Sequence, residues 1–156
     1  MKRANSARMM VALMLFSALS AVVVANDAGS GGDAGDSTST AFYLPASNDT
    51  YYGNLTSSTD ESDYYAINMS TNTGIAAQLI SPSGADFDLT LYSSSASLID
   101  SSASTGVDDI TSNGSAVGGT TIYIEVDRWS GSGQYTLQIW IFSTAGQPGS
   151  NQDDAG

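Results

Sequence analysis

The sequence predicts an all-β protein, a jelly-roll-like β-sandwich of two antiparallel sheets with about eight strands. Three observations lead to this prediction. Short runs in which apolar and polar residues alternate recur along the chain, and such alternation is typical of strands with one buried face. Clusters of Gly, Asn, Pro and Ser separate the runs at regular intervals, as turns do. No stretch of usable length has helical periodicity, so we expect the buried faces to pack as two layers.

Five runs carry the strongest alternation. Their apolar residues, which we expect to face the core, are Tyr65, Ile67 and Met69, then Ile75, Ala77 and Leu79, then Phe87, Leu89 and Leu91, then Ile122, Ile124 and Val126, and finally Tyr135, Leu137, Ile139 and Ile141. Weaker strands are expected near residues 51–56, 97–101 and 108–112. Between the runs lie turn signals such as Asn113-Gly114 and Gly131-Ser132-Gly133, which fix where each strand ends.

Residues 1–25 are predicted to be a secretory signal peptide. Lys2, Arg3 and Arg8 form a positive start, an apolar run follows over residues 9–24, and Ala25 ends a small-residue cleavage site. The alternative is a membrane anchor, but the apolar run is shorter than the roughly 20 residues that a membrane span needs. We therefore expect a secreted, extracellular or cell-surface protein with no stable membrane insertion after signal cleavage.

Signal cleavage would leave 131 of the 156 residues, enough for one domain with a single core. Three of the four basic residues lie in the signal, so Arg128 would stand alone against 16 acidic residues, a net charge near −15. Such a surface repels the phosphates of nucleic acid and attracts cations. We expect no nucleic-acid partner.

The chain contains neither Cys nor His. It can form no disulfide, no Ser-His-Asp triad and no zinc site of the usual ligand types. Paired carboxylates are the remaining route to hydrolysis, and they need a cleft that nothing in the sequence supplies. We predict that the protein is not an enzyme.

The two ends of the mature region have similar compositions. Residues 26–40 are expected to form an acidic Gly/Ser-rich linker and residues 143–156 a second linker. The segment 151–156 partly repeats residues 26–29. It is either the opening of a further copy in a tandem array or a chance likeness between two acidic linkers, and both interpretations stay open.

Four motifs, read in order, carry a family resemblance. They are Asp60-Glu61-Ser62-Asp63-Tyr64-Tyr65, residues 86–92 (DFDLTLY), residues 119–126 (GTTIYIEV) and residues 131–137 (GSGQYTL). Over residues 41–142 this series resembles the bacterial and archaeal pre-peptidase C-terminal domain, a small β-sandwich related to the collagen-binding domains of collagenases. The resemblance implies a non-catalytic extracellular module appended to a larger protein.

Acidic residues before the first strong strand point to oxygen coordination. Calcium takes six to eight oxygen ligands from carboxylates, amide side chains, backbone carbonyls and water. The resemblance implies that Asp60, Asp63 and the backbone carbonyl of Tyr65 bind a structural calcium ion that an acidic N-terminal segment closes over. The candidate ligands in that segment are Asn26, Asp27, Asp33 and Asp36. The alternative is a solvated acidic linker with no ion.

Large aromatic residues fall on positions that face away from the expected core. Some members of the resembled family bind fibrous protein through tyrosines on a sheet face, which implies such a role for Tyr64 and Tyr123. The predicted ligand-contact residues are Tyr64, Tyr123, Arg128, Trp129, Trp140 and Phe142. Alternatively, Trp140 and Phe142 cover the edge of the sandwich.

Four Asn-x-Ser/Thr sequons lie in the mature region, at Asn48, Asn54, Asn68 and Asn113. In an exported chain they predict N-glycan acceptors, although Ser and Thr are abundant enough to create sequons by chance.

These observations favour a calcium-stabilised binding or targeting module, whose partner is an extracellular polymer (protein or polysaccharide) or neighbouring modules. One alternative is a structural repeat of a glycosylated surface layer or filament. Another is a carbohydrate-binding module, which would need Trp129 and Trp140 aligned on one exposed platform.

Overall fold

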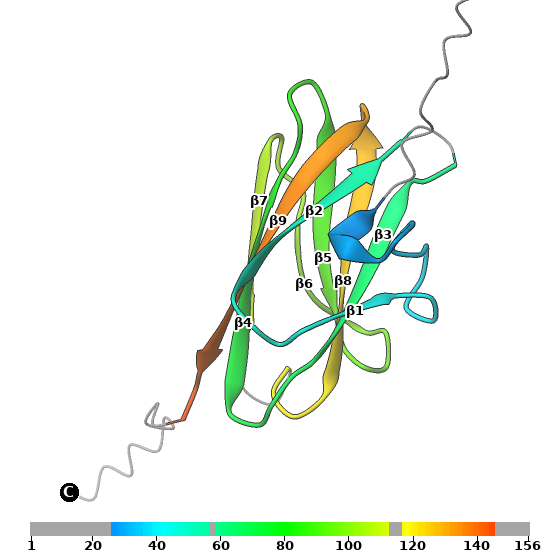
Figure 1. Ribbon diagram of the computed structural model, residues 1–156. Helices are drawn as coiled ribbons and strands as arrows, with labels where there is room; N and C mark the ends of the chain where they lie inside the picture. The colour runs from blue at the N-terminus through cyan, green and yellow to red at the C-terminus, as the bar shows by residue number, and fades with distance from the viewer. Residues whose placement is uncertain (1–25, 57–58, 113–116, 146–156) are drawn as a thin grey trace, which may run out of the picture.

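The computed structural model describes residues 26–56, 59–112 and 117–145. In this part of the chain, nine strands form two sheets that pack face to face (Figure 1). The first sheet has the order β1-β3-β8-β5-β6, with β1 at Phe42–Leu44, β3 at Ser62–Asn68, β8 at Thr121–Ser130, β5 at Asp86–Tyr92 and β6 at Leu98–Ser102. The second has the order β2-β9-β4-β7, with β2 at Asp49–Leu55, β9 at Gly133–Ser143, β4 at Thr73–Ile80 and β7 at Val107–Ser112. The predicted all-β sandwich is confirmed.

The sequence prediction needs one correction of topology. Strand β1 pairs with β3 in parallel, with Phe42 opposite Tyr65, whereas all other pairs are antiparallel within the described residues. Parallel neighbours need a crossover connection, and β2 provides it because the chain passes through the opposite sheet between β1 and β3. Since β1 has three residues, it is too short for alternation to reveal it.

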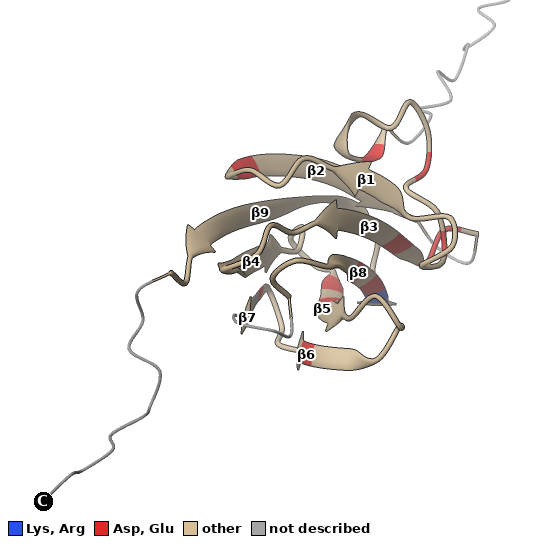
Figure 2. Ribbon diagram, turned by 90° about the horizontal axis from the view of Figure 1, so that it is seen from below, with Lys and Arg blue, Asp and Glu red and all other residues tan. Residues whose placement is uncertain are grey.

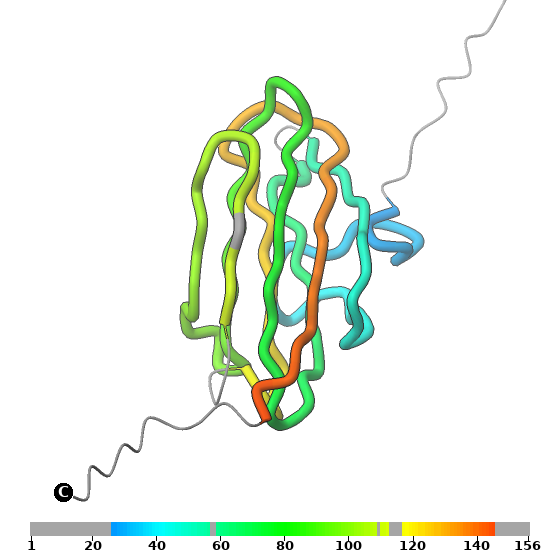
Figure 3. The backbone as a smooth tube through the Cα atoms, turned by 90° about the vertical axis from the view of Figure 1, so that its left-hand side faces the viewer, coloured from blue at the N-terminus to red at the C-terminus, as the bar shows by residue number. Residues whose placement is uncertain are grey.

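The core lies between the two sheets and contains the residues that alternation assigned to it. The rings of Tyr65, Phe87 and Tyr135 are fully buried, together with most leucines and isoleucines of β3, β4, β5, β8 and β9, although Ile80 at the end of β4 is 37% exposed. Ile141 is a second exception, because it is only partly buried near the end of β9. The backbone trace in Figure 3 shows the strands of both sheets running along the long axis of the sandwich.

Residues 26–40, expected to be a linker, instead fold against the sandwich. A short 3-10 turn, η1, covers Asp27–Gly29 and packs against β2, and Gly35 is hydrogen-bonded to Tyr64 of β3. Ala34 is 1% exposed and belongs to the core, while its carbonyl accepts a hydrogen bond from the Phe42 amide at 3.1 Å. Composition suggested a linker because the segment is rich in Gly, Ser and Asp, but one small apolar residue and backbone hydrogen bonds are enough to dock it.

Gly35 shows why glycine is needed in this segment. Its φ is +88°, a conformation that L-residues rarely adopt. A Cβ at this position would also lie 2.5 Å from the carbonyl oxygen of Thr40. This geometry lets the Gly35 carbonyl accept a hydrogen bond from the Tyr64 amide at 2.9 Å. The N-terminal segment is thereby fixed to the strand that carries Asp63.

No helix among the described residues is long and apolar enough to cross a membrane. The predicted signal peptide (residues 1–25) and most of the predicted C-terminal linker (residues 146–156) lie outside the described residues.

Candidate metal centre

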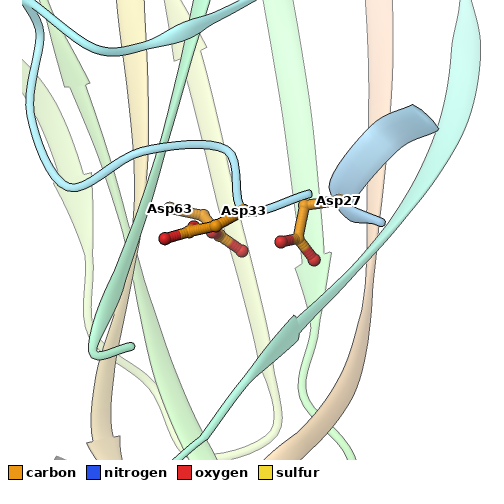
Figure 4. Close-up of side chains that lie close together, drawn as sticks. All are labelled: Asp27, Asp33 and Asp63. Atoms are coloured by element: carbon orange, nitrogen blue, oxygen red, sulfur yellow. The ribbon is translucent and has the colours of Figure 1, made fainter. Parts of the chain in front are cut away.

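Three aspartates from distant parts of the chain converge beside the N-terminal segment. Asp27 belongs to η1, Asp33 to the loop after it, and Asp63 to β3. Each offers a carboxylate oxygen, and these oxygens all lie within 4.8 Å of one another. Figure 4 shows the three side chains gathered in the space between the N-terminal segment and β3. We call Asp27, Asp33 and Asp63 the acidic cluster.

Asp63 points inward because of its register in the sheet. It lies opposite Val126 of β8, whose side chain is buried, and paired residues on neighbouring strands point to the same face. Asp63 is therefore 0% exposed, as is Asp27. A carboxylate so placed loses its hydration, and its charge is costly unless partners replace the lost water.

The partners of these two carboxylates are incomplete. Asp27 Oδ1 accepts a hydrogen bond from the Asn54 amide at 2.7 Å, and Asp63 Oδ2 accepts one from the Tyr135 hydroxyl at 2.5 Å. The second oxygen of each, Asp27 Oδ2 and Asp63 Oδ1, is buried without a hydrogen-bond partner. Buried polar atoms in proteins nearly always have a partner, so these two oxygens are the atoms of the site that could bind a cation.

Burial and neighbouring negative charge raise the pKa values of Asp27 and Asp63 in the acidic cluster. Burial raises the pKa of Asp63 to about 8, and the charges of Asp27 and Asp60 add to that rise, while the Tyr135 hydrogen bond opposes it. Burial is also the main cause of the raised pKa of Asp27, followed by the charge of Asp33. These raised pKa values disfavour the ionised forms of Asp27 and Asp63, and a bound cation would lower both pKa values.

A second group of acidic residues adjoins the acidic cluster. Burial, followed by the charges of Asp33, Asp27 and Asp36, raises the pKa of Asp60 to about 6. Asp60 Oδ1 is also buried without a partner. Asp36, Asp60 and Glu61 help to line an open depression of about 300 Å³ there. Figure 2 shows acidic positions on the N-terminal loop and on the strands beside it.

The remaining predicted ligands have other contacts. The side-chain oxygen of Asn26 accepts a hydrogen bond from the Gly31 amide at 2.8 Å, so it closes the N-terminal loop upon itself. The predicted ligand atom of Tyr65 is its backbone carbonyl, and this contact remains a prediction. The ring of Tyr65 lies in the core, and its hydroxyl is 2.5 Å from the Tyr135 hydroxyl. Of the seven predicted ligands, the structure thus brings three into one cluster and places Asp36 and Asp60 beside it.

Tyr135 is a residue of this site that sequence reasoning assigned only to the core. Its hydroxyl joins Tyr65 to Asp63, and burial raises its pKa well above the usual value. Gly53 of β2 makes room for it, because a Cβ there would lie 2.1 Å from the hydroxyl oxygen. A buried tyrosine usually needs a hydrogen-bond partner, and this rule could have paired it with the inward-facing Asp63.

The predicted tyrosines lie on the outer face of the five-stranded sheet. Tyr64 and Tyr92 stack with ring centroids 6.4 Å apart, and both donate hydrogen bonds to Glu125, at 2.6 and 2.7 Å. Tyr123 lies opposite Tyr92 in the register of β5 and β8. Tyr92 was not predicted to be a ligand-contact residue. The alternation of β5 nevertheless places it on the same outward face as Asp86, Asp88 and Thr90.

Arg128 is engaged within the fold. Its guanidinium forms an ion pair with Glu61 at 3.1 Å and donates a hydrogen bond to the Gly131 carbonyl. These contacts tie the loop before β3 to the β8–β9 turn. The predicted contact of Arg128 with a ligand remains a prediction.

The two tryptophans do not share a platform. Trp129 is 74% exposed at the end of β8, beside a depression lined by Asp86, Asp88 and Ala103. Trp140 is 42% exposed on β9, in the other sheet. The arrangement expected of a carbohydrate-binding module, with both tryptophans aligned, is therefore wrong for this pair. Phe142 packs over Gly74 of β4, where a Cβ would lie 2.5 Å from its ring.

The sequons differ in accessibility. Asn48 and Asn68 are exposed, and their side-chain oxygens accept hydrogen bonds from the Ile141 amide and the Thr121 hydroxyl. Asn54 is half-buried, and its backbone amide donates to Asp27. Asn113 lies outside the described residues.

Comparison with known proteins supports the fold. No protein family model and no curated protein matches the chain. Among solved structures, the pre-peptidase C-terminal domain of a collagenase from Bacillus anthracis aligns with a TM-score of 0.53 and 19% identity, over 63% of this chain and 92% of that one. PliG of Aeromonas hydrophila, a periplasmic inhibitor of g-type lysozyme, aligns with a TM-score of 0.49 and 13% identity, over 65% and 96%. The first alignment confirms the predicted resemblance: the fold of this chain is similar to that of a pre-peptidase C-terminal domain.

Proposed function

We propose that the chain is a non-catalytic binding or targeting module of an extracellular protein, in which a structural calcium ion ties the N-terminal segment to the sandwich. The observation that carries the metal proposal is the pair of buried, unpartnered oxygens on Asp27 and Asp63. Together with Asp33, they present oxygens close enough to share one ion. The likeness of fold to a pre-peptidase C-terminal domain and the predicted signal peptide support the extracellular setting.

The donor set fits calcium. The acidic cluster offers only oxygen, and the sequence contains no His or Cys to favour a softer metal. Calcium accepts several protein oxygens in flexible geometry, whereas magnesium keeps most of its water and is seldom bound by an all-protein set. Asp27, Asp33 and Asp63 would hold the ion, and Asp36 and Asp60 would add negative charge beside it.

A cation from solution would supply positive charge, of which the chain has almost none of its own. Beyond residues 1–25, Arg128 is the single basic residue in the sequence, and it pairs with Glu61. No lysine or arginine is therefore available to balance the acidic cluster. When bound, calcium supplies that positive charge, and the carboxylates orient around it.

The ion would connect segments that are far apart in the sequence. The Asn54 amide of β2 donates a hydrogen bond to Asp27 of η1, and the Tyr64 amide of β3 donates one to the Gly35 carbonyl. An ion shared by Asp27, Asp33 and Asp63 would also link the N-terminal segment to β3, in addition to these two hydrogen bonds. Its role would be to order the N-terminal segment, and with it the direction in which the module joins its neighbours.

The test is thermal unfolding of the full chain, exported and processed, with calcium, with magnesium and with chelator. A ligand that binds the native state alone, at about 100 times its dissociation constant, stabilises it by about 2.7 kcal/mol, which is roughly 10 °C for a domain of this size. We expect calcium to raise the midpoint by several degrees and magnesium to raise it much less. Equal midpoints in calcium and chelator would contradict the metal proposal.

A further inference from the structure

The outer face of the four-stranded sheet carries an open depression beside Trp140. It has a volume of about 380 Å³ and is lined by Asn48, Asp49, Thr50, Gln138, Ile139 and Trp140. These residues come from β9 and from the start of β2 with the loop before it. The depression shares no residue with the acidic cluster.

The exposure of Trp140 follows from its neighbours. β9 lies inside the sheet, between β2 and β4, where a large side chain is usually covered. On β4, however, Trp140 lies opposite Ala76, which is too small to cover an indole. Phe142 has Gly74 to pack over, while Trp140 keeps 42% of its surface exposed. The exposed part of this indole offers a flat apolar surface, with a polar N–H at its edge, on which a ligand can stack.

Polar groups surround the indole and are held in place. Gln138 lies opposite Thr50 in the register of β2 and β9. The Asn48 side-chain oxygen accepts a hydrogen bond from the Ile141 amide at 2.6 Å, which fastens the loop before β2 to β9. Asp49 Oδ1 accepts one from the Thr50 amide at 2.8 Å. An aromatic surface with fixed polar groups at its edge matches a ligand that has both an apolar face and hydroxyl groups.

A second aromatic residue extends the surface along the strands. Tyr52 of β2 is 54% exposed and lies opposite Thr136, four residues before Trp140 on β9. From the rise per residue and the spacing between strands, the Tyr52 and Trp140 backbones are about 14 Å apart. Thr50 and Gln138 lie between them in the register. This spacing suits an elongated ligand of several rings.

The charge and the topology limit what this ligand can be. The net charge near −15 after signal cleavage repels an acidic polymer. An extended peptide that adds to a sheet needs a free strand edge, and in this sheet the edge beside the depression belongs to β2. A peptide added there would pair with β2 and leave the face around Trp140 uncovered, because Trp140 lies on β9, which is paired on both sides. A neutral sugar chain needs neither opposite charge nor a free edge, since it binds through ring stacking and hydroxyl contacts.

We propose that the sheet face around Trp140, Gln138, Thr50 and Tyr52 binds a neutral polysaccharide, with one sugar ring on the indole of Trp140. This inference rests on the proposed binding function and names the class of its polymer. It is independent of the metal proposal, because the two sites have no residue in common.

The test uses the full chain, exported by a bacterial host that does not N-glycosylate, in calcium. Binding is measured as retention on microcrystalline cellulose and on chitin, and by titration with cellohexaose and chitohexaose. We expect saturable binding to at least one of these glycans, and Trp140→Ala to weaken it about tenfold or more, as truncation of an aromatic anchor does. Trp129→Ala removes the same side chain from the other sheet and should leave the affinity unchanged.

Fluorescence separates a local effect from misfolding. With Trp129 replaced by Phe, Trp140 is the single tryptophan of the sequence, so its emission should change and saturate on adding the bound hexasaccharide. No binding to any of the four glycans by a cooperatively folding chain would overturn the inference, as would unchanged affinity in Trp140→Ala. A dimer that Trp140→Ala dissociates, without any glycan binding, would also overturn it. The change in unfolding midpoint on adding calcium, measured on the same samples, tests the metal proposal separately from the glycan-binding proposal.

Discussion

Replacing Asp63 with Asn is expected to have opposite effects on the chain with and without calcium. Without calcium, the variant should be more stable than the unaltered chain at pH 8, by about 1–3 kcal/mol in the free energy of unfolding, because a buried and incompletely paired charge is removed. The Asn oxygen can still accept the hydrogen bond that Tyr135 donates. With calcium, the variant should lose most of the stabilisation that the ion gives.

Urea unfolding of both proteins, with chelator and with calcium, measures this reversal. Asp49→Asn is the matched control, since it removes one charge from an exposed position on β2 and should preserve the calcium response. A variant that is less stable than the unaltered chain in both conditions would mean that Asp63 stabilises the fold without an ion. That result would contradict the proposed role of the acidic cluster.

The stability of the calcium-free chain should fall as the pH rises from about 4 to about 8. Burial and neighbouring carboxylates raise the pKa of Asp63 to about 8 and that of Asp60 to about 6, both from a usual value of 3.8. An aspartate with a raised folded-state pKa holds its proton more tightly in the folded chain, so it favours folding below its unfolded pKa. This contribution is lost as the pH passes through the folded-state pKa. Because one pKa unit corresponds to about 1.4 kcal/mol, we expect a loss of a few kcal/mol, mainly from Asp63, since solvent screens the more exposed Asp60.

The groups that face Asp63 also favour a fall in stability as the pH rises. Asp27 and Asp33 of the N-terminal segment and Asp60 before β3 are acidic, and Tyr135 of β9 is a neutral hydrogen-bond donor in this range. The sequence has no His or Cys, so between pH 6 and 8 little else titrates apart from the terminal amine. Urea midpoints measured in chelator at pH 5.5 and pH 8 check the prediction. A midpoint that is constant or rises toward pH 8 would contradict it, and Asp63→Asn should flatten the dependence.

The fold could be predicted from the sequence because its signal is local. Phe87, Leu89 and Leu91 alternate with Asp86, Asp88 and Thr90, and that period places each residue on one face of β5 without knowledge of its neighbours. Strand β1 escaped prediction because three residues cannot show a period, and its pairing with β3 depends on tertiary contacts.

The candidate site could be predicted only in part, because its geometry depends on where the N-terminal segment docks. The resemblance named Asp63 and Asp27, the acidic composition of the N-terminal segment added Asp33, and the structure brings these three together. The contact of Asn26 with Gly31 depends on a loop that composition describes as a linker. Likewise, Trp129 and Trp140 are both exposed, but their assignment to different sheets follows from strand order, which alternation does not reveal.

Hydrogen exchange of the full chain, with and without calcium, tests the central claim most directly, because it locates the ion and its effect on the N-terminal segment together. Calcium should slow amide exchange in peptides that cover residues 26–40 and 54–64, where the acidic cluster and its backbone contacts lie. Peptides from β6, on the far edge of the same sheet as β3, should change little. Exchange that calcium leaves unchanged in residues 26–40, or slows equally over the whole chain, would contradict an ion held by Asp27, Asp33 and Asp63.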